Sequence, residues 1–98
     1  MTVQLKLTVN DAPIKTDYFV ESFLDHTVSG MIEALEGTGK IKDLNLSIDG
    51  DKVTINLNGI TVPINAFVNK IIRSTTIGMV STLQGVSEIN KLKLTVSK

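Results

Sequence analysis

The side chains that could carry out chemistry in this chain are few and do not converge in the sequence. His26 is the single histidine, and the chain contains no cysteine. One histidine cannot form a His-rich metal site, and without a nucleophile held beside it, it cannot form a catalytic triad. We therefore expect a solvent-facing or structural role for His26. We also expect no catalytic residue, no metal site and no cofactor.

Two short motifs could be taken for ligand-binding loops. Residues 37–40 read GTGK, but Ile41 stands where a P-loop needs a serine or threonine for magnesium, and the segment follows a predicted helix instead of opening one. Asp49 and Asp51 flank Gly50, but the further oxygen ligands of a calcium loop are missing. These patterns favour a helix stop and a hairpin turn.

Charged side chains are divided unevenly between the two halves of the chain. Residues 1–49 carry four lysines and eight acidic residues, whereas residues 50–98 carry six basic and two acidic residues. Exposed carboxylates keep ordinary pKa values and make poor general acids or bases. Either the charges on the two predicted helices form a solvated face or they match a charged partner. The residues concerned are Glu21, Asp25, Glu33, Lys70 and Arg73.

A basic patch is predicted on the polar side of a β-sheet. Alternation in two predicted strands places Lys6, Lys91 and Lys93 on the face opposite the core. Such a patch could hold an anion or a partner protein. Sequence-specific RNA reading would also need aromatic side chains on these strands to stack bases, and the strands carry none, which argues against nucleic acid.

A repeated unit must position all of these side chains. Residues 19–48 align without a gap to residues 67–96, and ten of the thirty positions are identical. Ninety-eight residues with 42% hydrophobic content suit one small core. We therefore expect a single domain, 1–98, made of two structural repeats, 1–49 and 50–98. The Pro-Ile pairs at 13–14 and 63–64 imply a local slip of two residues.

Each repeat follows the pattern of strand, short edge piece, helix and strand. Apolar spacing predicts helices at 17–36 and 66–84, between strands at 3–9, 41–48, 53–57 and 89–96, with edge pieces at 12–14 and 60–64. Two such units give the βαββαβ order of a ferredoxin-like two-layer α+β sandwich, with strand order 4-1-3-2 and both helices on one face. The rival arrangement keeps these elements but exchanges strands between two chains.

Two glycines fall in the middle of the predicted helices. Glycine there costs roughly 0.5 to 1 kcal/mol relative to alanine, so its presence at Gly30 and again at Gly78 calls for a compensating gain. Thr27 and Thr75 lie three residues earlier, on the same side of each helix. We expect these two Thr-x-x-Gly sites to form a close helix–helix contact. A ligand on the bared backbone, or packing of helix on sheet, are the alternatives.

Part of the second half resembles a segment of a known family. The residues that carry the resemblance are Asn58-Gly59, Val62-Pro63-Ile64-Asn65, Phe67-Val68, Gly78-Met79-Val80, Leu83 and Gly85. They look like a short module at the tail of some P-loop proteins of the molybdopterin-guanine dinucleotide biosynthesis type. The resemblance implies a duplicated, free-standing version of an accessory or assembly module. Because this chain has no P-loop, no nucleotide-binding residue carries over.

These patterns favour a non-catalytic protein-interaction or self-assembly module. Its expected partner is another protein or a second copy, and a homodimer is one option. The alternative is a small-ligand or anion-binding sensor domain. The chain begins with a strand pattern and has no apolar run near the roughly 20 residues of a membrane span, so we expect a cytoplasmic protein that is not an enzyme and does not contact a membrane.

Overall fold

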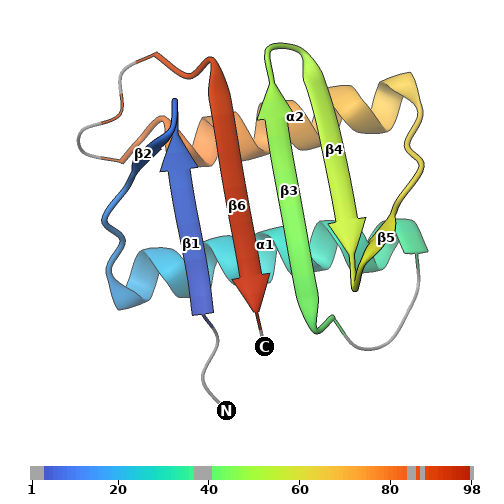
Figure 1. Ribbon diagram of the computed structural model, residues 1–98, viewed down its shortest axis with the longest axis horizontal. Helices are drawn as coiled ribbons and strands as arrows, with labels where there is room; N and C mark the ends of the chain where they lie inside the picture. Colours follow the sequence, from blue (N-terminus) through green and yellow to red (C-terminus); the bar gives the residue numbers. More distant parts are fainter. Residues whose placement is uncertain (1–3, 37–40, 84–85, 87, 98) are drawn as a thin grey trace.

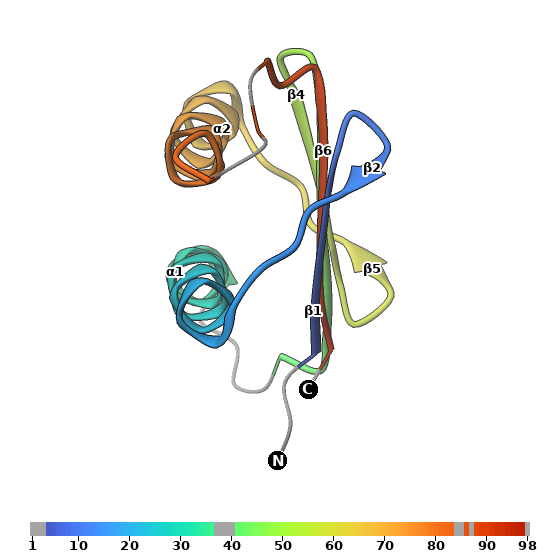
Figure 2. The same cartoon turned by 90° about the vertical axis from the view of Figure 1, so that its left-hand side faces the viewer.

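The computed structural model describes residues 4–36, 41–83, 86 and 88–97, and within them it forms one six-stranded antiparallel sheet and two helices. The elements are β1 (Gln4–Val9), β2 (Ala12–Pro13), α1 (Tyr18–Glu36), β3 (Asp43–Asp49), β4 (Lys52–Leu57), β5 (Ile60–Thr61), α2 (Ala66–Val80) and β6 (Lys91–Ser97). Both helices cover one face of the sheet, and the short strands β2 and β5 curl over the other (Figures 1 and 2). The chain is thus a small mixed α+β domain.

The order of the strands differs from the predicted ferredoxin-like order. The sheet runs β2-β1-β6-β3-β4-β5, so the four long strands follow the order 1-4-2-3 and not 4-1-3-2. Both orders allow right-handed crossovers, and handedness therefore could not decide between them. The hairpins decide: β1 pairs with β2, and β4 pairs with β5. Because a strand has only two edges, neither β1 nor β4 can also lie between two long strands.

An asparagine with a left-handed backbone makes each of these hairpins. Asn58 has φ 51° and precedes Gly59, and its Oδ1 accepts hydrogen bonds from the backbone N–H groups of Lys42 and Asp43 at 2.9 Å each. Asn10, with φ 52°, makes the same two bonds to the start of β6. Asparagine tolerates this conformation and caps exposed amides with its side chain. Each turn therefore also fixes the neighbouring central strand.

Strand pairings recur at an offset of 48 residues. Thr8 of β1 faces Lys93 of β6, and Asn56 of β4 faces Asn45 of β3 in the same register. The offset continues into the edge strands, where Thr8 faces Pro13 just as Asn56 faces Thr61. The inferred slip of two residues was therefore wrong, because Pro13 corresponds to Thr61 and not to the later proline.

The core lies between the sheet and the helices, as alternation predicted. Inward-facing strand residues are buried: Leu5, Leu7, Val9, Leu44, Leu46, Ile48, Val53, Ile55, Leu57, Leu92, Leu94 and Val96. Leu24, Val28 and Ile32 of α1 and Ile72 and Val80 of α2 close the core from the other side. In the central pair of strands, Leu46 faces Leu94. These two leucines are 48 residues apart, so the approximate two-fold axis that relates the halves passes between them.

Side-chain caps begin both helices. Asp17 Oδ1 accepts a hydrogen bond from the N–H of Val20 at 2.8 Å, and Asn65 Oδ1 accepts one from Val68 at 2.8 Å, which satisfies a free amide in each first turn. α2 ends at Val80, four residues before the predicted 84. The glycines expected to stop the helices, Gly37, Gly39 and Gly85, lie outside the described residues, as does the GTGK segment.

One buried hydroxyl of the described chain has no hydrogen-bond partner. Thr76 of α2 is fully buried, and its Oγ1 meets no donor or acceptor. The corresponding residue of α1, 48 positions earlier, is Val28, which is also fully buried. A valine is therefore already accommodated at this place in the other half of the molecule.

We expect Thr76→Val to raise the free energy of unfolding by about 1 kcal/mol, because an unsatisfied buried polar group costs roughly 1 to 3 kcal/mol. Urea denaturation measures the change. Thr54→Val, at a half-buried position of β4, is the matched control and should change stability by less than about 0.5 kcal/mol. A less stable Thr76→Val protein would show that the hydroxyl is bonded after all.

Candidate functional site

Large apolar side chains are exposed on the outer side of the helix layer. Phe19 and Phe67, at corresponding places in α1 and α2, are 71% and 70% exposed. One turn later, Phe23 and Ile71 are 52% and 48% exposed, although helical spacing had assigned both to the buried stripe. The rings of Phe19 and Phe23 pack against each other with centroids 6.0 Å apart. Contiguous exposed apolar groups of this kind mark interaction surfaces in soluble proteins.

A groove lies beside this aromatic pair. Its lining comes from the first turns of α1 and from the end of α2 and the turn that follows it: Phe19, Val20, Phe23, Leu24, Met79, Thr82 and Leu83. The helices run in opposite directions, so the start of one lies beside the end of the other (Figure 1). The groove is lined by apolar side chains apart from a single threonine, and it opens onto the outer surface.

The two glycines do not bring the helices together, which corrects the predicted contact. Gly30 and Gly78 are exposed, and a Cβ atom added to either would meet nothing within 4 Å outside its own turn of helix. Thr27 and Thr75 are only half-buried. The physical reason lies in the helical period of about 3.6 residues: Gly30 and Gly78 fall on the side of the exposed phenylalanines, away from the core. Within the described chain nothing offsets their cost.

An uncharged strip therefore runs along the outer face of each helix. We define the helix face as the outward residues Phe19, Phe23, Gly30, Ala34, Phe67, Ile71, Gly78 and Thr82. Each helix presents bulky side chains in its first half and small ones in its second. The nearest exposed charges, Glu33 on α1 and Lys70 on α2, lie on the outer flanks of the strip.

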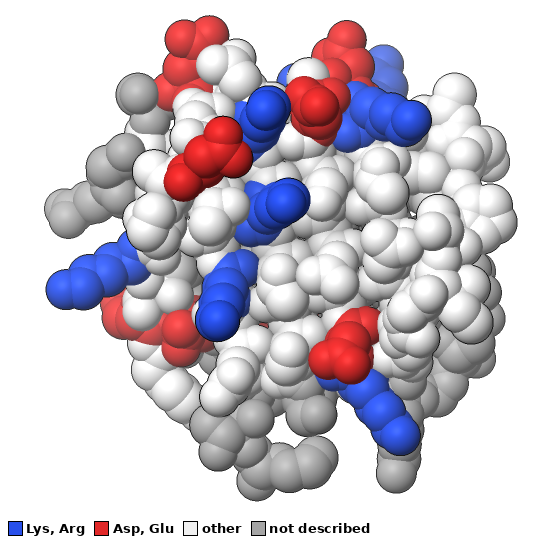
Figure 3. All heavy atoms as spheres, viewed as in Figure 1, with Lys and Arg blue, Asp and Glu red and all other residues white. Residues whose placement is uncertain are grey.

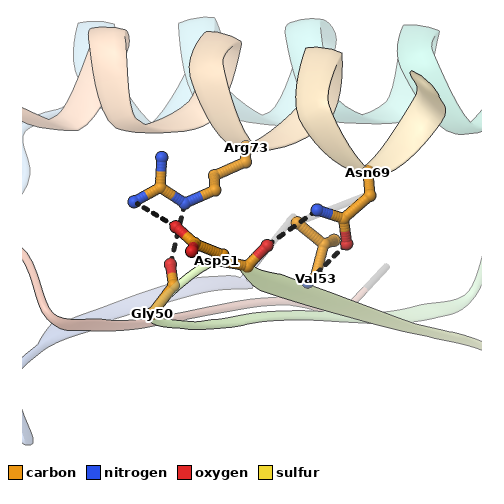
Figure 4. Close-up of polar contacts among 5 residues, drawn as sticks. All are labelled: Gly50, Asp51, Val53, Asn69 and Arg73. Carbon is orange, nitrogen blue, oxygen red and sulfur yellow. Dashed lines mark hydrogen bonds and ion pairs between the residues drawn. The ribbon is translucent and has the colours of Figure 1, made fainter. Parts of the chain in front are cut away.

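The remaining residues of the predicted charge-matched set serve the fold. Arg73 donates from Nε to the carbonyl oxygen of Gly50 at 2.7 Å and lies 3.8 Å from the Asp51 carboxylate. Asn69, one turn earlier, donates to the Asp51 carbonyl at 2.7 Å and accepts from the N–H of Val53 at 2.8 Å (Figure 4). This network ties α2 to the β3–β4 hairpin.

Two carboxylates expected at the surface are partly or wholly covered. Asp25 is only 7% exposed and accepts a hydrogen bond from Ser29 Oγ at 3.0 Å. Glu21 is half-buried and accepts one from Thr16 Oγ1 at 3.0 Å. Apolar spacing alone places every polar helix residue outward, and it therefore missed these two. His26 is exposed and contacts the Ser22 carbonyl through Nδ1 at 2.7 Å.

The predicted basic residues do gather on the open face of the sheet. β1 pairs with β6, so Lys6 lies diagonally across from Lys93, and Lys91 precedes Lys93 by two residues on the same face. All three are exposed, and basic side chains form a short column over β1 and β6 (Figure 3). A shallow depression at one end of this column combines Lys91 and Lys93 with Asp11 and Asp49. Its mixed charge gives no preference for an anion.

Metal ligands and membrane spans are both missing from the residues that the structure describes. No group of three or more acidic or histidine side chains there could hold a metal ion. Neither helix, in that part of the chain, has the length and apolar character needed to cross a membrane.

Comparison of the chain with models of protein families, with curated proteins and with solved structures found no match.

Proposed function

We propose that this chain is a non-catalytic protein-interaction or self-assembly module that acts through the helix face, and that it is built as a tandem repeat. The observation that carries the proposal is the exposure of Phe19, Phe23, Phe67 and Ile71 on one uncharged surface. Covering one such side chain is worth about 1.5 to 3 kcal/mol, so four of them supply a substantial driving force for association.

The glycines support the same proposal from the opposite direction. At an exposed helix position an alanine would be more favourable than glycine by roughly 0.5 to 1 kcal/mol. Gly30 and Gly78 bear this cost at equivalent places, and neither has an internal neighbour that would exclude a Cβ atom. A partner that packs against the bared backbone would offset the cost. An accessory or assembly role, which the family resemblance implied, agrees with such a surface.

The tandem-repeat part of the proposal rests on shared contacts. The two asparagine turns, the two helix caps and the two outer strand pairings all recur at an offset of 48 residues. The exposed phenylalanines and glycines follow the same offset. Residues that repeat without contributing to the core are what a surface duplicated for binding would retain.

We expect the helix face to be protected from chemical labelling wherever the protein is working. Because the chain has no cysteine, Phe23→Cys supplies a single thiol on this face, and Asn45→Cys supplies a matched exposed thiol on the open sheet face. Maleimide labelling is measured inside intact cells that express each full-length variant, and again after denaturation as the reference for full access.

The proposal predicts that in the cell the thiol of the Phe23→Cys variant is labelled at least tenfold more slowly than the thiol of the Asn45→Cys variant, and that both react equally after denaturation. Equal labelling rates in the folded state would contradict it, because a free helix face is as accessible as the sheet face. The purified Phe23→Cys protein gives a second reading. Protection that grows with protein concentration indicates self-assembly, and protection confined to the cell indicates a different partner.

A further inference from the structure

We propose that the occupant of the helix face is a second copy of this chain, stacked so that α1 of each copy lies antiparallel across α2 of the other. This inference rests on the proposed function and specifies the partner. It is carried by the shape of the helix face, by its size and by the position of the two charges on its flanks.

The shape of the helix face is complementary to itself. In an antiparallel crossing the first half of one helix meets the second half of the other. The bulky residues Phe19 and Phe23 of one copy then lie over Gly78 and Thr82 of the other. Because the halves of the chain are related by the approximate two-fold axis, the bulky residues of α2 meet the small residues of α1 in the same way. Close packing at interfaces requires this matching of projections with hollows.

The helix face is large enough for a stable dimer. The Cα atoms of the molecule extend over 34 × 34 × 18 Å, and the sheet and helix layers are stacked along the short dimension (Figure 2). The broad face is therefore larger in projection than the roughly 800 Å² that each partner buries in a standard interface. Four exposed large apolar side chains near its middle meet the usual composition of an interface core, which is depleted in charge and rich in aromatic residues.

The flanking charges select between the two possible stackings. When α1 crosses α2 of the other copy, Glu33 and the partner's Lys70 fall at the same level on the same outer flank. When α1 instead crosses α1, Glu33 falls beside the serine at position 22, and Lys70 beside the serine at position 81. Neither Glu33 nor Lys70 makes an ion pair within the described chain. The first stacking therefore gains two ion pairs per dimer, and the second gains none.

Charge reversal tests this stacking without disturbing the apolar contact. Glu33→Lys and Lys70→Glu each place two like-charge pairs in the homodimer. We expect each variant to weaken dimerisation about tenfold at low salt, since exposed pairs are worth up to about 1 kcal/mol each. An equimolar mixture of the two variants should associate with nearly the wild-type affinity, because every pair in the mixed dimer is again attractive. Lys6→Glu, on the open sheet face, is the control and should leave the affinity unchanged.

Sedimentation velocity on the full chain supplies the readout. Weak homodimers of the two variants together with a restored mixed dimer would support the stacking. If both variants associate as the wild type does, while acidic substitution of the phenylalanines still abolishes association, the stacking is overturned and the proposed function stands. If the wild type is monomeric and the helix face is nevertheless protected in cells, the second copy is overturned as the occupant in favour of another protein.

Discussion

Replacing Phe19 and Phe67 together by aspartate is expected to abolish association of the chain and leave its fold intact. Each phenylalanine is about 70% exposed and contributes nothing to the buried core, so the folded monomer loses little by the change. In the dimer, two copies would bury four carboxylates against apolar surface, and an unpaired buried charge costs several kcal/mol. We expect an affinity loss of at least a hundredfold by sedimentation velocity.

The control for this double substitution is Tyr18→Asp with Ile60→Asp. These two residues are 87% and 71% exposed but lie outside the helix face. They test whether any loss of exposed apolar surface reduces association. Equal effects of the two pairs would contradict a specific surface and would indicate nonspecific stickiness. Circular dichroism and urea denaturation check that all four substituted positions leave a folded protein.

The largest expected effect on stability comes from the centre of the sheet. Leu46→Ala and Leu94→Ala should each lower the free energy of unfolding by about 2 to 5 kcal/mol, the cost of removing a buried leucine and leaving a cavity. Both side chains are 1% exposed, and they face each other across β3 and β6. Because they occupy equivalent places in the two halves, their costs should agree within roughly 1 kcal/mol.

Urea denaturation measures both costs, with Asn45→Ala on the exposed side of β3 as the control. The control should change the free energy of unfolding by less than about 0.5 kcal/mol. A difference of more than about 2 kcal/mol between the two leucine variants would contradict the equivalence of the halves, since each value carries the uncertainty of extrapolation.

Alternation and helical spacing predicted the elements and the core because those signals are local. Every inward strand residue that was expected and is described, from Leu5 to Val96, is buried. The strand order was missed although its signal is also in the sequence. Asn10-Asp11 and Asn58-Gly59 are hairpin turns directly after β1 and β4, and a strand that pairs with its own hairpin has one edge left.

The outer face of the helices was missed for a different reason. Residues identical in both halves were assumed to serve the internal two-fold, and Gly30 and Gly78 were therefore placed between the helices. They face outward with open space around them. Phe19 and Phe67 are also identical in both halves and fall outside the buried stripe, which is the pattern expected of a duplicated surface. Apolar spacing counts hydrophobic residues but cannot tell a covered one from an exposed one.

Contacts between distant segments account for the remaining differences. Arg73 was expected on a charged outer surface, but the β3–β4 hairpin lies within its reach, and it binds the carbonyl of Gly50 there. Asp25 is buried by the packing of α1 on the sheet layer. Neither arrangement follows from the local pattern of a helix, because both depend on which strands lie beneath it.

Sedimentation equilibrium of the unmodified chain, from micromolar to millimolar concentration, tests the central claim most directly. The account predicts that the weight-average mass rises with concentration from the monomer value of 10.6 kDa toward a plateau at twice that mass, and that added salt shifts the curve to higher concentration. A mass that stays at the monomer value over the whole range at low salt, or one that climbs past the dimer without a plateau, would contradict a helix face closed by one second copy.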